Sequence, residues 1–178
     1  MYTKKSMEEL DRLTASEMVQ ASKHAVIVIL DDVRSMHNVG STFRTGDAFA
    51  VEAVYLCGYT PAPPHRDIHK TALGATETVS WRHFPATVDA VAMAKQDGYK
   101  IYAVEQAHNS ISLEQLDWKG EKVALVFGNE VTGVSDEVLA LADGCIEIPQ
   151  WGSKHSLNIS VSVGVVLWEM IRGYRRRD

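Results

Sequence analysis

The chain has 178 residues, of which 46% are hydrophobic and 23% charged, and its formal net charge is −5. This composition is typical of one globular domain whose core needs no disulfide or metal. The acidic balance excludes a protein that binds nucleic acid through its overall charge, so any such binding must rely on local basic patches. Cys57 and Cys145 lie far apart in apolar runs, which indicates buried thiols and not a zinc pair.

The first 24 residues carry charges but no apolar segment of the kind that a signal peptide contains. The later apolar runs are too short to span a bilayer. We therefore expect a cytoplasmic protein, with an N-terminal, helical extension over residues 1–24 and one domain over residues 25–178.

From His24 onward, short apolar runs alternate with longer amphipathic ones. A continuous apolar run closed by polar residues is typical of a strand buried on both faces, and a 3.6-residue period is typical of a helix. The expected strands are His24–Asp32, Ala53–Gly58, Glu77–Phe84, Tyr99–Gln106, Glu121–Glu130 and Cys145–Pro149. The expected helices are Ser35–Val51, Ala86–Gly98, Val134–Gly144 and Asn158–Tyr174.

This alternation predicts an α/β fold with a mainly parallel sheet flanked by helices. In such folds ligands collect beyond the carboxyl ends of the strands, and here the strand-ending loops are the most polar and Gly-rich stretches. Two helix boundaries are predicted from caps, with Ser135 as an N-cap and Gly144 as a terminator.

Three common active-site motifs are incomplete or absent in this sequence. "GNEVTGVS" has two glycines five apart, but Val134 stands where a nucleotide-binding P-loop needs Lys. His65 and His69 have helical spacing for a metal, yet the prolines before them predict a loop and no third ligand is adjacent, so we expect no metal. No G-x-S-x-G motif supports a serine hydrolase.

The stretch "NVGSTFRTGDAF" (residues 38–49) places Asn38 at the expected start of a helix and Arg44 six residues later. Six residues turn a helix through about 600°, so the two side chains do not share a face. We expect Asn38 to act from the preceding loop and Arg44 from the first or second turn. Taken alone, Arg44 is better explained as a surface residue whose aliphatic stem covers apolar neighbours.

The stretch "IPQWGSKHSLNIS" (residues 148–160) separates two apolar segments and holds more polar groups than a turn needs. Asn158 precedes the last expected helix, whose start offers unpaired backbone N–H groups and a partial positive charge. Gly152 would let the chain approach a flat ligand. Ser156, Asn158 and the backbone at Leu157 are therefore candidates for binding a small polar molecule.

Three segments in order resemble the signature motifs of the SpoU/TrmH branch of the SPOUT superfamily, which are RNA 2′-O-ribose methyltransferases. They are "NVGSTFRTGDAF", "ALVFGNEVTGVSDEVL" and "IEIPQWGSKHSLNISVSVGVVLWE", and the resemblance spans residues 25–169. It implies a C-terminal trefoil knot, bent S-adenosylmethionine as cofactor in the knotted region, and a homodimer with sites at the subunit interface. The domain over residues 25–178 would then be the catalytic one.

The resemblance also assigns residues. The positions that match its catalytic motif residues are Asn38, Arg44, Glu130, Ser156 and Asn158. The positions expected to contact the cofactor, mainly through backbone, are Val104, Gly128, Ile148 and Leu157.

Two groups are candidates for accepting the proton of the ribose hydroxyl. A guanidinium stays protonated in proteins, so Arg44 is better suited to binding an RNA phosphate and stabilising a developing alkoxide than to acting as a base. His155 is the alternative acceptor, since an imidazole titrates near neutral pH.

We expect the partner to be RNA, with a guanosine in tRNA first and rRNA second. The "HRDIHK" segment (65–70), the "RGYRRR" tail (172–177) and Lys4, Lys5 and Arg12 are the candidate phosphate-binding groups. The alternative from another class is a catalytically weak SPOUT-like module that binds RNA or cofactor.

Overall fold

The structure, a computed structural model, describes residues 2–6 and 8–175. Within these residues, seven strands form one fully parallel sheet in the order β3-β2-β1-β6-β4-β7-β5. The strands are β1 His24–Asp31, β2 Val51–Cys57, β3 Ser80–Phe84, β4 Lys100–Val104, β5 Ile111–Ser112, β6 Val123–Phe127 and β7 Gly144–Glu147. The predicted α/β class with a parallel sheet is confirmed.

Two apolar clusters, one on each face of the sheet, explain the continuous apolar runs. Val28 and Leu30 of β1 point into one cluster, whereas Ile27 and Ile29 point into the other. Successive strand residues face opposite sides, so a strand covered on both faces must be apolar at every position.

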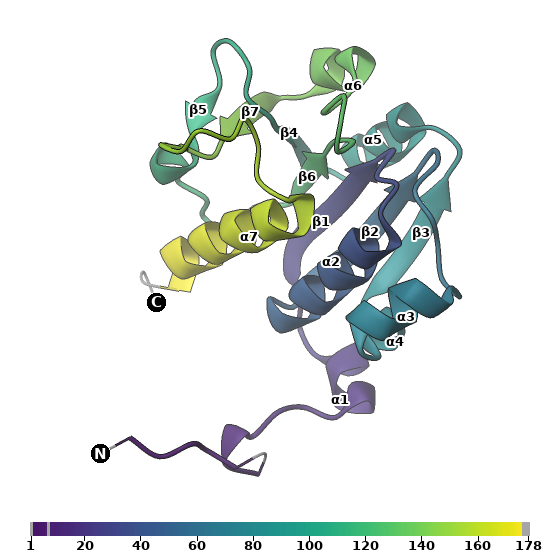
Figure 1. Cartoon of the computed structure of the whole chain (residues 1–178), viewed down its shortest axis with the longest axis vertical. Helices are drawn as coiled ribbons and strands as arrows, with labels where there is room; N and C mark the ends of the chain where they lie inside the picture. The colour runs from purple at the N-terminus through teal and green to yellow at the C-terminus, as the bar shows by residue number, and fades with distance from the viewer. Residues whose placement is uncertain (1, 7, 176–178) are drawn as a thin grey trace.

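Helices cover the two faces unequally (Figure 1). The face with the larger cluster carries α2 Met36–Ala48, α3 Arg66–Ala72, α4 Ala75–Thr78 and α7 Ile159–Arg175. The other face carries α5 Thr87–Gln96 and α6 Asp136–Leu141. The shorter elements are η1 Glu8–Leu10, α1 Ala15–Gln20 and η2 Leu113–Gln115. None of the described helices is long and apolar enough to cross a bilayer.

The last helix, α7, is apolar on more sides than the core covers. Its buried side includes Val163, Leu167 and Met170, and it lies beside α2, where the Phe49 and Trp168 rings meet edge to face at 6.4 Å. Val161, Val165 and Trp168, at helical spacing on its outer side, are exposed. An apolar stripe on an exposed helix face is a feature of interaction surfaces.

Several local predictions were wrong. The strand expected over Glu77–Phe84 begins only at Ser80, because Glu77 and Thr78 belong to α4. The segment 65–70 is not a loop, because His65 caps α3 by accepting a hydrogen bond from the Asp67 backbone N–H at 3.2 Å, directly after the prolines. Gly144 does not terminate a helix, since α6 ends at Leu141 and Gly144 begins β7. A helix that starts right after prolines is common, because Pro ends extended segments and fixes φ near helical values.

A further error concerns the start of α2. Ser35 is the N-cap and accepts a hydrogen bond from the Asn38 backbone N–H at 3.2 Å. Asn38 therefore lies in the first helical turn and not in the preceding loop. The helix begins two residues before the stretch that suggested it, because Ser35, which caps helices as well as Asn does, satisfies the Asn38 backbone N–H.

The two cysteines are unpaired. Cys57 is buried and Cys145 half-buried, and burial raises the pKa of the Cys57 thiol to about 12. A thiol with so high a pKa stays protonated and unreactive at neutral pH, as expected of a structural residue.

Candidate active site

A pocket of about 650 Å³ opens beyond the carboxyl ends of β4, β6 and β7, against the start of α7. Its walls include Val104, Gly128, Ile148 and Leu157, the four positions at which cofactor contacts are expected. Glu130, Ser156 and Asn158 line it as well. Because these segments are far apart in the sequence, their meeting here depends on the parallel sheet, whose strands all end at this edge.

Close backbone packing shapes the loop of residues 128–134 that forms one wall. A Cβ atom at Gly128 would lie 2.0 Å from the carbonyl carbon of Gly133, so no side chain fits there. Asn129 and Gly133 exchange two backbone hydrogen bonds of 3.0 Å, and Gly133 has a φ of +72° that favours glycine. The loop is thus a tight turn that presents backbone to the pocket.

Asn129 holds this loop in place. Its side-chain oxygen accepts hydrogen bonds from the backbone N–H groups of Val131 at 2.9 Å and Thr132 at 3.2 Å. Its amide nitrogen donates to the carbonyl of Asp32, at the end of β1, at 2.7 Å. The neighbouring Asp31 is buried and accepts from the Ser135 backbone N–H at 2.9 Å. Both ends of the loop are therefore tied to β1.

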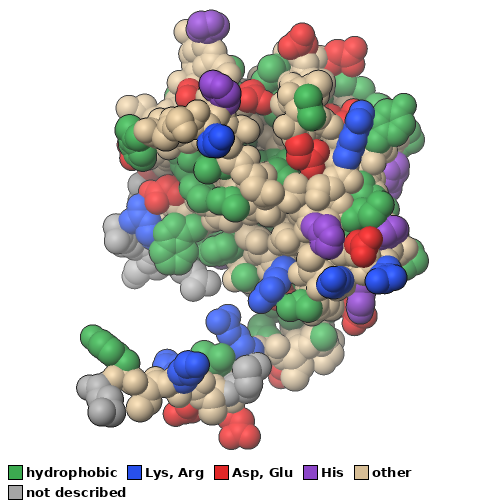
Figure 2. Space-filling view, in the orientation of Figure 1, with side chains coloured by type: hydrophobic (Ala, Val, Ile, Leu, Met, Phe, Trp, Pro, Cys, Tyr) green, Lys and Arg blue, Asp and Glu red, His purple; other side chains and the backbone are tan. Residues whose placement is uncertain are grey.

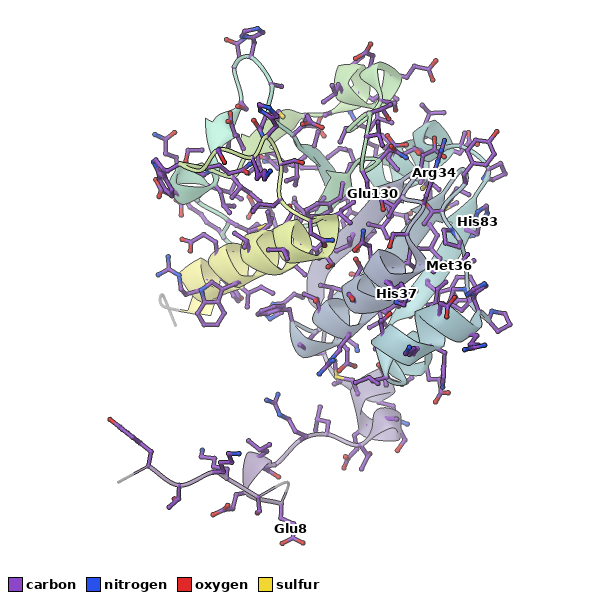
Figure 3. All side chains as sticks on the ribbon, viewed as in Figure 1. Glu8, Arg34, Met36, His37, His83 and Glu130 are labelled. Carbon is purple, nitrogen blue, oxygen red and sulfur yellow. The ribbon has the colours of Figure 1, made fainter. Side chains whose placement is uncertain are left out.

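Glu130 and two asparagines form a hydrogen-bonded chain at the pocket. The Asn38 amide donates to Glu130 at 3.1 Å, and the Asn158 amide donates to the Asn38 oxygen at 3.1 Å. Glu130 also accepts from the backbone N–H groups of Arg34 and Ser35, both at 3.1 Å. Figure 3 shows Glu130 beside the start of α2, near Arg34. Residues from the three sequence motifs thus meet in one network.

The surroundings of Glu130 favour its ionised form. Partial burial raises the pKa of this carboxyl, but hydrogen bonds from the Arg34 and Ser35 backbone and from the Asn38 side chain outweigh it. The pKa therefore lies below its usual value of 4.5. A carboxylate that accepts several N–H groups is an anion at neutral pH and acts as an acceptor, not as a proton donor.

The segment before α7 supplies the opposite wall. Asn158 begins the helix as expected: its side-chain oxygen accepts from the Ser160 backbone N–H at 2.9 Å. The carbonyl of His155 accepts from the Gln106 side chain at 2.5 Å, which links this segment to the loop after β4. Gly152, in contrast, does not line the pocket, and a Cβ atom there would meet nothing within 4 Å.

Arg44 is on α2 but not in the pocket wall of the same chain. It is exposed, on the stripe of α2 that also carries His37, Ser41 and Ala48, and no hydrogen bond or ion pair joins it to another described residue. Asn38, which is buried and faces the pocket network, lies six residues away, or about 9 Å along the helix axis and on another side of it.

No group of three or more His, Cys, Asp and Glu side chains in residues 2–6 and 8–175 is placed to hold a metal ion. His65 and His69 lie at the two ends of α3's first turn, where they line a second, smaller hollow of about 410 Å³ with Arg66 and Glu77.

The comparisons with known proteins agree with the geometry. The model of the SpoU rRNA methylase family matches residues 25–168. The chain belongs to this family. A tRNA (guanosine(18)-2′-O)-methyltransferase of Thermus thermophilus is 32% identical over 164 residues, which are 92% of this chain and 83% of that protein.

Solved structures show the same arrangement. The A. aeolicus TrmH/SpoU tRNA modifying enzyme superposes with a TM-score of 0.81 at 28% identity, over 92% of this chain and 82% of that one. An AdoMet-bound rRNA methyltransferase from Sinorhizobium meliloti superposes with a TM-score of 0.79 at 27% identity, over 87% and 59%. The resemblance inferred from the three motifs is confirmed, and the protein is an RNA methyltransferase by family.

The motifs did not single out three residues that the structure places at the pocket. Asn129 has the loop-holding contacts described above, Glu105 lines the pocket after β4, and Gln106 bridges to His155. Asn129 stands between Gly128 and Glu130, and an Asn beside Gly at a strand end is a turn signal that could have marked it. Glu105 and Gln106 directly follow Val104, the residue of that strand end that was expected to contact the cofactor.

Proposed function

We propose that the protein transfers a methyl group from S-adenosylmethionine to the 2′-hydroxyl of a ribose in RNA, most specifically a guanosine in tRNA. The network of Glu130, Asn38 and Asn158 beside the pocket carries this proposal, since it joins residues of all three motifs. The tRNA substrate is supported by the relatives' names, which specify guanosine in tRNA. The family description and the Sinorhizobium protein name rRNA, which is the alternative substrate.

The pocket fits S-adenosylmethionine in size and lining. Its volume of about 650 Å³ lies within the range of small-molecule sites, and Val104, Ile148 and Leu157 offer apolar contacts to an adenine ring. Because a side chain at Gly128 would collide with the backbone of Gly133 and Val134, glycine there keeps the loop in the conformation that lines the pocket. These residues would bind the cofactor, and the polar groups of Ser156 and Asn158 would orient the reacting end.

The chemistry then depends on positioning. Bound S-adenosylmethionine would supply an electrophilic methyl carbon: the ribose 2′-oxygen would bond to it, the carbon–sulfur bond would break with its electrons on sulfur, and the hydroxyl proton would pass to solvent water. Because a guanidinium has no acceptor and is a poor base, the role of Arg44 is to bind an RNA phosphate through two parallel N–H groups and to stabilise the alkoxide as it forms. His155, which lines the pocket, is the alternative group for accepting the proton.

We propose that the active protein is a homodimer in which Arg44 serves the pocket of the partner subunit. Arg44 is exposed and outside its own pocket, and α2, which carries it, lies against α7, whose exposed apolar stripe consists of Val161, Val165 and Trp168. Figure 2 shows hydrophobic side chains gathered over α7. A second copy that covers this stripe would bury Trp168, now 58% exposed, and bring a second α2 close to the pocket.

RNA would be held mainly by α2 and α3. His37, Arg66, His69 and Lys70 are exposed there, and Figure 2 shows Lys, Arg and His side chains gathered on this face. Lys4, Lys5 and Arg12 are exposed on the N-terminal segment. Of the C-terminal tail, Arg172 is half-buried and paired with Glu169, which makes it a poor RNA ligand, and Arg176 and Arg177 lie outside the described residues.

The remaining features follow from the family. We propose that the segment between β7 and α7 passes through a trefoil knot, which membership of the family supports. We also propose a boundary between an N-terminal extension over residues 1–24 and a catalytic domain over 25–178, since the family match begins at Ala25. A tRNA substrate supports a cytoplasmic location.

Two measurements test the function. Calorimetric titration with S-adenosylmethionine should show binding at one site per subunit, and transfer of labelled methyl groups to bulk tRNA and to rRNA should identify the substrate. Mapping of the modified nucleotide would then locate a 2′-O-methylguanosine in tRNA. Transfer to rRNA alone would select the alternative substrate. Binding without transfer to either RNA would reduce the protein to a binding module.

A further inference from the structure

The pocket has an unusual charge for a site next to RNA. Among the described side chains that line it, Glu105 and Glu130 carry a formal charge at neutral pH, and none is Lys or Arg. Neither carboxylate forms an ion pair with a described Lys, Arg or His. The lining therefore has two negative charges that the chain itself does not neutralise.

Glu105 is fixed in this position. One carboxylate oxygen accepts from the Val134 backbone N–H at 3.1 Å and the other from the Gln106 backbone N–H at 2.8 Å. A Cβ atom at Gly133 would lie 2.2 Å from the Glu105 carboxylate, so glycine at this position is what lets the carboxylate lie against the loop. Both oxygens act as acceptors, which is the role that an ionised carboxylate has.

Glu130 is the second carboxylate of the pocket and belongs to the same loop. Hydrogen bonds from the start of α2 and the residues just before it fix its position. Glu105 is bound to the end of the loop and Glu130 belongs to its start, so the loop of residues 128–134 lies between two fixed anions. A ligand that enters the pocket meets the electrostatic field of both.

This field distinguishes the two ligands that the reaction exchanges. S-adenosylmethionine carries a fixed positive charge on its sulfonium sulfur, whereas the product S-adenosylhomocysteine has a neutral thioether there and is otherwise the same molecule apart from the methyl group. Because opposite charges attract more strongly in a partly desolvated pocket than in water, the cationic donor gains more than the product.

We infer that Glu105, together with Glu130, makes the pocket prefer S-adenosylmethionine over S-adenosylhomocysteine, so that the spent product leaves more readily than the donor. The inference rests on the proposed function, and it adds a specificity-determining role for Glu105 that the three motifs do not include. Glu105 acts through charge and contributes no atom to the transferred group.

The test compares binding of the two ligands to the full-length protein by isothermal titration calorimetry. Glu105→Gln keeps the shape and one acceptor oxygen but removes the charge. We expect it to weaken S-adenosylmethionine binding by about five- to ten-fold, as for a charge pair in a water-accessible pocket, and S-adenosylhomocysteine binding by less than about two-fold. Glu114→Gln, a change at an exposed acid outside the pocket, is the matched control and should alter neither.

The product serves as an internal control for folding. If Glu105→Gln merely distorts the loop, both ligands weaken by the same factor, and the inference is overturned. Wild-type protein that binds both ligands equally overturns it too, while leaving the methyltransferase proposal intact. Wild-type protein that binds neither ligand sinks the proposed function and this inference together.

Ionic strength supplies a second readout. A preference that comes from charge should fall when salt is raised from about 50 mM to about 500 mM, because the ions screen the carboxylates. A preference that is constant over this range would come from shape alone and would contradict the role of Glu105.

Discussion

Asn38 and Glu130 are 92 residues apart in the chain and joined by a hydrogen bond of 3.1 Å at the pocket. The bond connects the first turn of α2 to the loop after β6, and Asn158 extends it to the start of α7. One carboxylate thus orders three segments that would otherwise be independent loops. This contact gives the Glu130 carboxylate a structural role, although a carboxylate has no obvious part in moving a methyl group.

Replacing Glu130 by Gln should therefore reduce stability and turnover together. One of the three N–H donors that now share the carboxylate would face an amide NH₂ group, and an unsatisfied donor costs about 1 to 2 kcal/mol. We expect a fall of that size in the free energy of unfolding, measured by urea denaturation, and a lower rate of methyl transfer. Glu137→Gln, at an exposed position of α6, is the control and should change neither.

The same carboxylate predicts how stability depends on pH. The pKa of Glu130 is lower in the folded protein than its usual value of 4.5, so the folded state binds the proton less tightly than the unfolded state. The stabilisation is complete above pH 4.5 and is lost as the pH falls through the lower, folded value. The stability gap between wild type and Glu130→Gln should be constant from about pH 6 to 8 and shrink below about pH 4. A gap that grows on acidification would contradict this.

Gly128 and Gly152 offer a matched pair of substitutions. A methyl group at Gly128 would collide with the backbone of Gly133, whereas one at Gly152 would meet nothing within 4 Å. Gly128→Ala should displace the loop and weaken S-adenosylmethionine binding at least about ten-fold, because a shifted backbone no longer matches the ligand. Gly152→Ala should bind as the wild type does. Equal affinity of the two variants in calorimetry would show that the 128–134 loop does not contact the cofactor.

The sheet and the position of the pocket follow from the sequence because both depend on short-range patterns. The apolar runs of β1 and β6 require cover on both faces, and parallel strands bring their ending loops to one edge. The helical state of residues 66–72 was missed, because the prolines before them read as a loop and the His65 cap is not a typical one. Local composition outweighed the helical spacing of the apolar and polar residues.

The contacts within the site were less accessible to sequence reasoning. Glu105 follows a strand as many surface acids do, and only the approach of Gly133 and the Val134 N–H shows that it is fixed. Such pairings form between distant segments, and nothing in the spacing of either segment specifies them. The resemblance identified the motif residues. It did not predict that most of them line one pocket while Arg44 lies on an exposed helix face.

Arg44 should matter for turnover and not for folding. It is exposed and makes no hydrogen bond or ion pair with the described residues, so Arg44→Ala should change stability by less than about 0.5 kcal/mol. Methyl transfer should fall by about 100- to 1,000-fold, as when a group that stabilises a developing oxyanion is removed. Arg44→Lys keeps the charge but cannot bind a phosphate with two parallel N–H bonds, so it should remain at least about ten-fold slow. Near-normal turnover in either variant would remove Arg44 from the mechanism.

Mixing two inactive variants tests whether Arg44 serves the partner's pocket. Leu157→Trp places a larger side chain in the pocket wall and should block cofactor binding, while Arg44→Ala leaves the pocket intact. If each site takes its pocket from one subunit and its arginine from the other, a mixed dimer contains one site with both parts intact. Since half of the dimers are mixed after random exchange, an equimolar mixture should recover about a quarter of wild-type activity.

The alternative arrangement gives a different number, which makes the mixing experiment decisive. If Arg44 acted on its own subunit's pocket, every site in a mixed dimer would lack either the pocket or the arginine, and no activity would return. Trp168→Glu provides the control for assembly, because a charge on the exposed stripe of α7 should prevent dimers and abolish recovery in the same mixture. Sedimentation equilibrium measures whether the Trp168→Glu protein has the mass of a monomer or of a dimer. A dimer that survives this substitution would place the subunit interface on another face.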